Sequence, residues 1–148
     1  MTRILSAEHQ MFRAMFDEVE ELLPGLERVQ DVKRLARLVE GLLRKHAKAE
    51  DDLLMLPQAR AQADDPPYMS CRHEHQEIDG HLTLVHSARS VGQARTLLCK
   101  AMVASRKHFQ LEERRIFPLM EKRIPHEALA KLGTMWFLQR HAPTNWMV

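Results

Sequence analysis

Four long segments of this chain repeat their apolar residues at helical spacing, and each apolar stripe contains one histidine. Spacings of three, four and seven residues place side chains on one face of an α-helix, and nowhere do β-branched residues alternate as in a strand. The segments span about 6–23, 31–56, 69–88 and 93–117, and a shorter helix is expected at about 126–140. This pattern predicts an all-α fold, an up-down-up-down four-helix bundle with a short C-terminal helix.

Proline and glycine mark the breaks between the helices. The breaks fall at Pro24-Gly25, Pro57, the loop residues Pro66-Pro67, Gly92, Pro118 and Pro125. We expect one domain over residues 1–148, with the bundle at about 6–123 and a helical extension at about 126–148. Within the extension, Trp136, Phe137 and Trp146 are expected to cover the open end of the bundle or to form a homodimer contact.

The histidines in the stripes lie near one level of the bundle: His9, His46, His75 and His108. The second and fourth of them are each followed by a glutamate four residues on, Glu50 and Glu112. Residues i and i+4 share a helix face, so both carboxylates must point into the core with their histidines. Burying an unpaired carboxylate costs several kcal/mol or forces its protonation. A bound cation is therefore the best explanation for two carboxylates among four imidazoles.

The two halves of the chain repeat the same motifs. The Glu-His-Gln sequence at residues 8–10 recurs at residues 74–76, and the His-x-x-x-Glu pattern at 46–50 recurs at 108–112. Each half thus supplies one helix with a single histidine and one helix with a His-x-x-x-Glu pair. A pseudo-twofold arrangement of this kind can hold two metal ions, with the two carboxylates available to bridge them.

This order of motifs resembles the hemerythrin family, specifically the bacterial hemerythrin-like domains with the HHE cation-binding signature. The resemblance extends to about residue 123, and four motifs in the right order are specific where a single one is weak. It implies a non-haem di-iron centre, in which two iron ions are bridged by two carboxylates and an oxo or hydroxo group. Matched in order, the metal ligands of the family fall on His9, His46, Glu50, His75, His108 and Glu112.

Two positions depart from the respiratory hemerythrins. Those proteins carry two histidines four residues apart on the third helix, whereas the positions four before and four after His75 are Cys71 and Asp79. Their last helix places its carboxylate five residues after the histidine, where this chain has Glu113. We prefer Glu112 because it repeats the Glu50 spacing, and Glu113 stays the alternative. The departures favour hemerythrin-like proteins linked to iron, oxygen, nitric oxide or peroxide responses over reversible oxygen carriers.

Other polar residues have weaker claims on the metal. His73 competes with His75, but its neighbours at helical spacing are polar, so we expect it to be solvated. Asp79, His81 and Tyr68 are the alternatives for completing the coordination sphere. Cys71, one turn before His75, is expected to pack in the core, with thiol redox chemistry as the alternative. Asp51 and Glu113 are expected to accept hydrogen bonds from imidazole N–H groups or to be exposed.

The composition argues against nucleic-acid binding, a membrane span and a disulfide-stabilised fold. There are 22 basic and 20 acidic residues, interspersed throughout, so no basic cluster indicates nucleic-acid binding. No window approaches the roughly 20 apolar residues that a membrane span needs. The two cysteines make no disulfide framework, and the N-terminus lacks the apolar core of a signal peptide, so we expect a reduced, cytoplasmic setting.

We therefore expect a non-haem di-iron protein that binds, senses or handles oxygen, nitric oxide, peroxide or iron. One alternative is a di-iron enzyme that removes peroxide or nitric oxide, or that oxidises ferrous iron. The others are an iron donor for iron–sulfur cluster repair and a structural bundle loaded with zinc or manganese. The residues alone do not separate a sensor from a slow enzyme, because both depend on access channels and partners.

Overall fold

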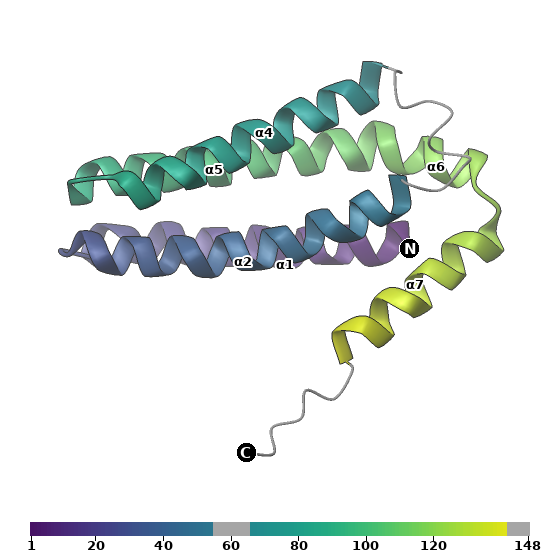
Figure 1. The fold of residues 1–148 in the computed structure, drawn as a ribbon, viewed down its shortest axis with the longest axis horizontal. Coiled ribbons are helices and arrows are strands. Elements are labelled where there is room, and N and C mark those ends of the chain that lie inside the picture. The colour runs from purple at the N-terminus through teal and green to yellow at the C-terminus, as the bar shows by residue number, and fades with distance from the viewer. Residues whose placement is uncertain (55–65, 142–148) are drawn as a thin grey trace.

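Four long helices form two antiparallel pairs that stack on each other in the computed structural model, which describes residues 1–54 and 66–141 (Figure 1). The elements in chain order are α1 (Thr2–Leu22), the 3-10 turn η1 (Leu23–Gly25), α2 (Val29–Leu54), α4 (Pro66–Ser87), α5 (Val91–Leu111), the π turn η2 (Glu112–Ile116), α6 (Phe117–Arg123) and α7 (His126–His141). Helices α1 and α2 make one pair, and α4 and α5 make the other. The expected all-α bundle with an additional C-terminal helix is confirmed. None of the described helices is both long and apolar enough to cross a membrane.

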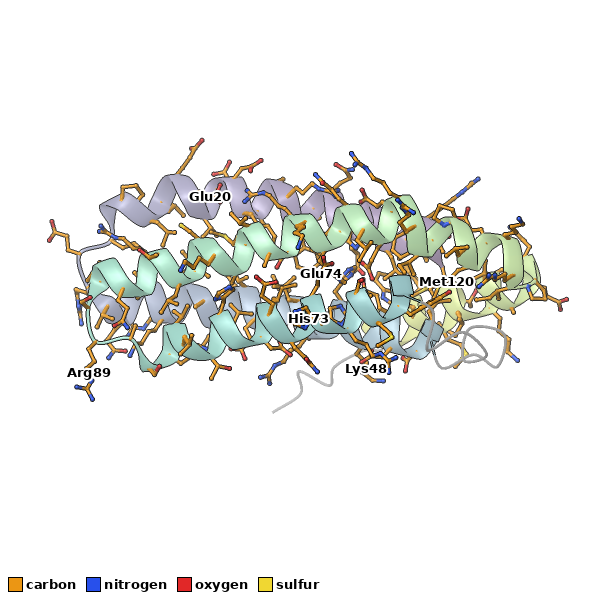
Figure 2. The ribbon with its side chains drawn as sticks, turned by 90° about the horizontal axis from the view of Figure 1, so that it is seen from above. Glu20, Lys48, His73, Glu74, Arg89 and Met120 are labelled. Atoms are coloured by element: carbon orange, nitrogen blue, oxygen red, sulfur yellow. The ribbon has the colours of Figure 1, made fainter. Side chains whose placement is uncertain are left out.

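The apolar stripes build two clusters of buried residues with a polar layer between them. One cluster contains Phe12, Phe16 and Phe109 and fills the bundle toward the two short loops, the end that Arg89 marks in Figure 2. The other contains Leu5 and Met120 and fills the opposite end. The histidines and glutamates of the stripes lie between the two, so apolar packing on both sides holds their helices in register.

Several helix boundaries differ from the sequence prediction. Helix α1 begins at Thr2 rather than at about residue 6. Pro66 and Pro67, expected in a loop, form the first turn of α4. A proline is tolerated there because the backbone N–H that it lacks has no partner in a first turn. Residues 55 and 56 of the expected second helix, Pro57, Trp146 and residues 142–148 of the expected extension lie outside the described residues.

The helix that begins with α5 continues past Pro118, because the π turn η2 accommodates the proline. The N–H of Phe117 donates to the carbonyl of Glu112, five residues back instead of four. A proline has no N–H to donate, and in a regular α-helix its ring clashes with the carbonyl four residues back. The extra residue rotates the remainder of the helix about its axis. As a result Met120 is 1% exposed, while Leu119, which continues the regular spacing from His108 and Glu112, is only half-buried.

Helix α7 folds back toward the N-terminal end of α1 (Figure 1). The N-terminal ammonium of Met1 donates to the carbonyl of Leu129 at 3.1 Å. Trp136 is half-buried against the apolar cluster at this end of the bundle, as expected for a residue that covers it. Phe137 is 54% exposed. A homodimer contact through this segment stays a prediction.

Candidate metal centre

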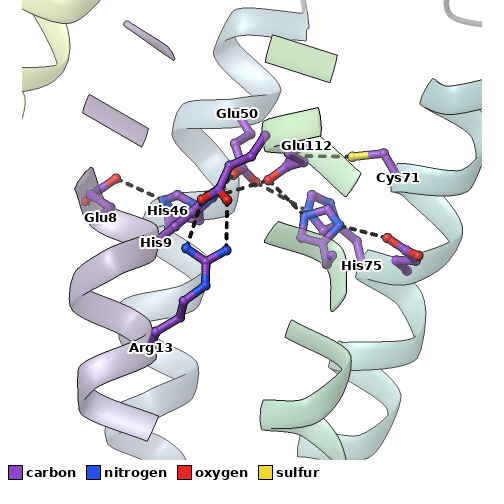
Figure 3. Close-up of polar contacts among 11 residues, drawn as sticks. Glu8, His9, Arg13, His46, Glu50, Cys71, His75 and Glu112 are labelled. Atoms are coloured by element: carbon purple, nitrogen blue, oxygen red, sulfur yellow. Dashed lines mark hydrogen bonds and ion pairs between the residues drawn. The ribbon is translucent and has the colours of Figure 1, made fainter. Parts of the chain in front are cut away.

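Six side chains from the four long helices converge in the polar layer (Figure 3). They are His9 of α1, His46 and Glu50 of α2, His75 of α4, His108 of α5 and Glu112 at the start of η2. Five of them are at most 2% exposed, and the side chain of His75 is 23% exposed. The structure thus brings together all six residues that the sequence predicted as metal ligands.

The four imidazoles face each other in two pairs. Nε2 of His9 lies 2.9 Å from Nε2 of His46, and Nε2 of His75 lies 2.8 Å from Nε2 of His108. A neutral imidazole binds a metal through a ring nitrogen that carries no proton. Each pair therefore presents two donor atoms to one point.

The two carboxylates lie between the imidazole pairs. Oε1 of Glu50 is 2.6 Å from Nε2 of His46, and its Oε2 is 3.3 Å from Nε2 of His75. Oε2 of Glu112 is 3.4 Å from Nε2 of His9 and 3.4 Å from Nε2 of His108. Each carboxylate therefore contacts both pairs, which is the position that a bridge between two ions requires.

Three of the four carboxylate oxygens have no hydrogen-bond partner among the described residues: both oxygens of Glu50 and Oε2 of Glu112. The short contacts to the imidazoles do not have hydrogen-bond geometry. Unpartnered oxygens in a buried site cost free energy, and a cation supplies the missing compensation. The site therefore fits a pair of metal ions, because it combines two histidine pairs, two carboxylates that contact both pairs and apolar surroundings.

The protein's own groups compensate the two carboxylates unequally. Burial and the neighbouring Glu50 raise the pKa of Glu112 well above its usual range. Burial also acts to raise the pKa of Glu50, but the positive charge of the adjacent His46 opposes it and holds that pKa well below its usual range. His46 responds in turn: burial acts against its charged form, and Glu50 and Glu8 nevertheless raise its pKa to about 9. One glutamate is thus stabilised as an anion, and the other lacks a counter-charge.

Comparison with known protein families decides the family of this chain. The family model of the hemerythrin HHE cation-binding domain matches residues 1–119. The chain belongs to this family. No curated protein and no solved structure matches the chain. The expected hemerythrin-like identity is confirmed, and this HHE domain is a cation-binding protein whose six clustered residues all lie within the matched range.

The outer ring nitrogens of three imidazoles in the HHE domain contact further carboxylates. The pairs are His46 Nδ1 with Glu8 Oε2 at 2.9 Å, His9 Nδ1 with Glu113 Oε1 at 2.9 Å, and His108 Nδ1 with Glu74 Oε2 at 3.3 Å. A carboxylate at Nδ1 keeps the proton on that nitrogen and leaves Nε2 as the donor atom for a metal. These contacts thus set the orientation and the tautomer that coordination needs.

Sequence reasoning did not assign Glu8 and Glu74 a role. A signal was present, because each residue directly precedes a stripe histidine in the repeated Glu-His-Gln sequence at 8–10 and 74–76. Each glutamate contacts a histidine on the next helix of its own half, His46 for Glu8 and His108 for Glu74. The pseudo-twofold repeat therefore extends to the residues around the cluster.

Glu113, the alternative to Glu112, lies outside the cluster and contacts it through His9. Its carboxylate accepts two hydrogen bonds from Arg13, from Nη1 at 2.9 Å and from Nη2 at 3.0 Å. Its side chain is 27% exposed. Burial opposes its charge, but Arg13, and after it His9, lower the pKa of Glu113. The expectation that Glu113 accepts from an imidazole agrees with this contact.

Among the described residues, none of the remaining sequence candidates contributes a donor atom to the converging cluster. His73 and Asp79 are exposed on α4, where Figure 2 labels His73. His81 lies 3.8 Å from Glu77 on the same helix, and Tyr68 is buried in the apolar cluster that contains Leu5. Asp51, a candidate acceptor, is exposed.

A cavity of about 120 Å³ reaches the cluster between α2 and α4. Its walls include the exposed residues Arg44 and Asp79 and, at the inner end, Glu50, His75 and His108. A buried water needs only about 10–15 Å³ of such space, so the cavity has room for a small molecule or several waters. The partial exposure of His75 follows from this opening.

Proposed function

We propose that this hemerythrin HHE domain holds a carboxylate-bridged pair of iron ions and uses it to bind, sense or handle oxygen, nitric oxide or peroxide. His9 and His46 would serve one ion, His75 and His108 the other, and Glu50 and Glu112 both. One observation carries the proposal: each buried carboxylate contacts both imidazole pairs.

The donor set leaves room for an additional ligand. Two imidazoles and two carboxylate oxygens would give each ion four donors, fewer than the six that octahedral iron takes. Imidazole together with carboxylate suits iron, and open positions are typical of non-haem iron sites that bind oxygen. The bound iron pair would supply redox activity and Lewis acidity next to the cavity.

The protein's own residues support such a centre in two ways. Glu8 and Glu74 hold protons at the outer nitrogens of His46 and His108, so that the inner nitrogens face the ions. Phe109 stacks on His9, with ring centroids 4.1 Å apart, and closes one side of the layer to water. Water exclusion strengthens the electrostatic interactions within the centre.

The size of the cavity supports a small ligand rather than a large organic substrate. At about 120 Å³, the space beside Glu50 and His75 accommodates a diatomic molecule or peroxide. Typical sites for drug-sized ligands are cavities of about 300–1,000 Å³.

Metal analysis combined with absorption spectroscopy tests the proposal. Protein isolated from its own cell is expected to carry two iron ions per chain. An oxidised, bridged pair is expected to show near-ultraviolet charge-transfer bands that shift when azide is added. Spectra of anaerobic protein before and after oxygen, nitric oxide or peroxide then identify the ligand, and sustained consumption of that ligand would indicate an enzyme. Stoichiometric zinc without iron, in protein made under iron-replete conditions, would overturn the proposal.

A further inference from the structure

We propose that Cys71 binds one of the two ions through its sulfur, so that the two halves of the centre differ in chemistry. This inference rests on the two-ion centre proposed above. It assigns a coordinating role to a residue that the sequence alone suggests is core packing.

The described residues contain two groups of metal-binding atoms, and one of them includes sulfur. The first group is His9, His46, Glu50 and Glu112, and the second is Cys71, His75, His108 and Glu112. Within each group the donor atoms lie within 4.8 Å of one another. Glu112 belongs to both, as expected of a carboxylate that bridges two ions.

The position of Cys71 is that of a ligand rather than of a packing residue. It lies one turn before His75 on α4 and is 1% exposed. Its Sγ donates to Oε1 of Glu112 at 3.5 Å, so the thiol faces the polar layer (Figure 3). The second oxygen of the same carboxylate, Oε2, is buried without a hydrogen-bond partner among the described residues. An unpartnered carboxylate oxygen within the same donor group independently indicates a cation at this place.

The cavity reaches the cluster at residues other than Cys71. The walls of the cavity include His75, Glu50 and His108, and Cys71 is not among them. Sulfur coordination would therefore occupy a position away from the cavity and leave the cavity side for a small ligand.

Coordination changes one bond at the cysteine. The S–H bond breaks, an S–metal bond forms, and the proton leaves to water. The second ion would then have one sulfur, two nitrogens and one or two oxygens as donors, whereas the first would have nitrogen and oxygen alone. Thiolate is a soft ligand that favours iron, zinc or copper(I) over magnesium, calcium or manganese. The two positions are therefore expected to differ in metal affinity and in spectrum.

Cobalt(II) titration of the stripped full-length chain tests the assignment, because a thiolate bound to cobalt(II) adds a charge-transfer band that imidazole and carboxylate do not produce. The wild type and Cys99→Ala, which removes the other free cysteine, are expected to show this band. Cys71→Ala is expected to lose the band. Its affinity for the second ion should fall by at least about tenfold, because the loss of a residue that only hydrogen-bonds a metal ligand already weakens metal binding by that much. Cys71→His is expected to bind two ions without the band, because an imidazole nitrogen replaces the sulfur as the donor atom.

The outcomes separate the two proposals. If the wild type binds two cobalt ions and Cys71→Ala retains the band, the sulfur assignment is wrong and the two-ion centre stands. If the wild type binds no cobalt, zinc or iron, the proposed function itself is wrong. Far-UV circular dichroism checks that the variants fold. Should Cys71→Ala fail to fold, X-ray absorption of the zinc-loaded wild type decides without a variant: a sulfur neighbour at one of two zinc ions supports the proposal, and nitrogen and oxygen neighbours alone overturn it.

Discussion

Removal of the metal is expected to destabilise the bundle, because the polar layer contains buried charge that the protein compensates only in part. Glu50 and Glu112 are 2% and 1% exposed, and three of their four oxygens have no hydrogen-bond partner among the described residues. Without a cation the layer must protonate, take up water or loosen. Each of these responses lowers the free energy of unfolding.

The magnitude follows from mass action. An ion that binds only the folded chain stabilises it by about 2.7 kcal/mol when the free ion is at 100 times its Kd. Two such ions contribute about 5 kcal/mol in total. In a chain of this size, 1 kcal/mol moves Tm by about 2–4 °C. Stripping both ions is therefore expected to lower Tm by about 10–20 °C.

Thermal melts followed by far-UV circular dichroism measure the difference between iron-loaded protein and chelator-stripped protein, with stripping verified by elemental analysis. The double variant Glu50→Gln, Glu112→Gln is expected to bind iron poorly, so its melts with and without iron should nearly coincide. Its stripped form should also melt above the stripped wild type, because neutral amides need less compensation than anions. The matched control Glu18→Gln, which changes an exposed glutamate of α1, is expected to keep the full difference. Equal Tm values for loaded and verified stripped wild type would refute the reasoning.

Four further substitutions test the arrangement of the centre. His75→Ala is expected to lower metal occupancy sharply, whereas His73→Ala should leave it nearly unchanged, because His75 lies in the cluster and His73 is exposed. Elemental analysis measures the occupancy, and equal losses in the two variants would contradict this placement. Glu8→Gln is expected to weaken metal binding about 10–100-fold in a competition titration, because the Glu8 carboxylate orients His46 through its contact with Nδ1. An unchanged affinity would show that this contact does not orient the ring. Phe109→Ala is expected to lower the free energy of unfolding by about 3–5 kcal/mol in denaturant titrations, since it removes a buried ring beside the centre. A loss below about 1 kcal/mol would mean that the core collapses to fill the space.

Local spacing in the sequence was sufficient to predict the helices and the residues that meet in the polar layer. A helix places residues i and i+4 on one face, so His46 and Glu50 reach the same level, as do His108 and Glu112, whatever surrounds them. Apolar residues before and after each histidine point the same face into the core. These relations are contained within single helices, and the internal repeat made the pairing of the two halves visible as well.

Contacts between helices were decided only by the tertiary structure. Glu8 contacts His46 on the next helix and not its own neighbour His9, because adjacent residues of a helix point in directions about 100° apart. Which histidine it reaches depends on how α1 and α2 pack, and sequence spacing carries no such information. The same holds for Cys71, which helical spacing places only on a buried face. Its Sγ contact with Glu112 depends on where α4 and η2 meet.

The register beyond Glu112 also depended on the three-dimensional structure. A proline at position 118 predicts a helix end, because it removes a backbone donor and crowds the preceding turn. The chain instead forms a π turn, which contains one residue more than an α-helical turn. The extra residue rotates the helix that follows, so that Met120 is buried, whereas regular spacing predicts Leu119 at this place. Sequence periodicity assumes a constant rotation per residue. Only the packed structure shows where that rotation changes, because the burial of Ile116, Phe117 and Met120 against the other helices stabilises the irregular turn.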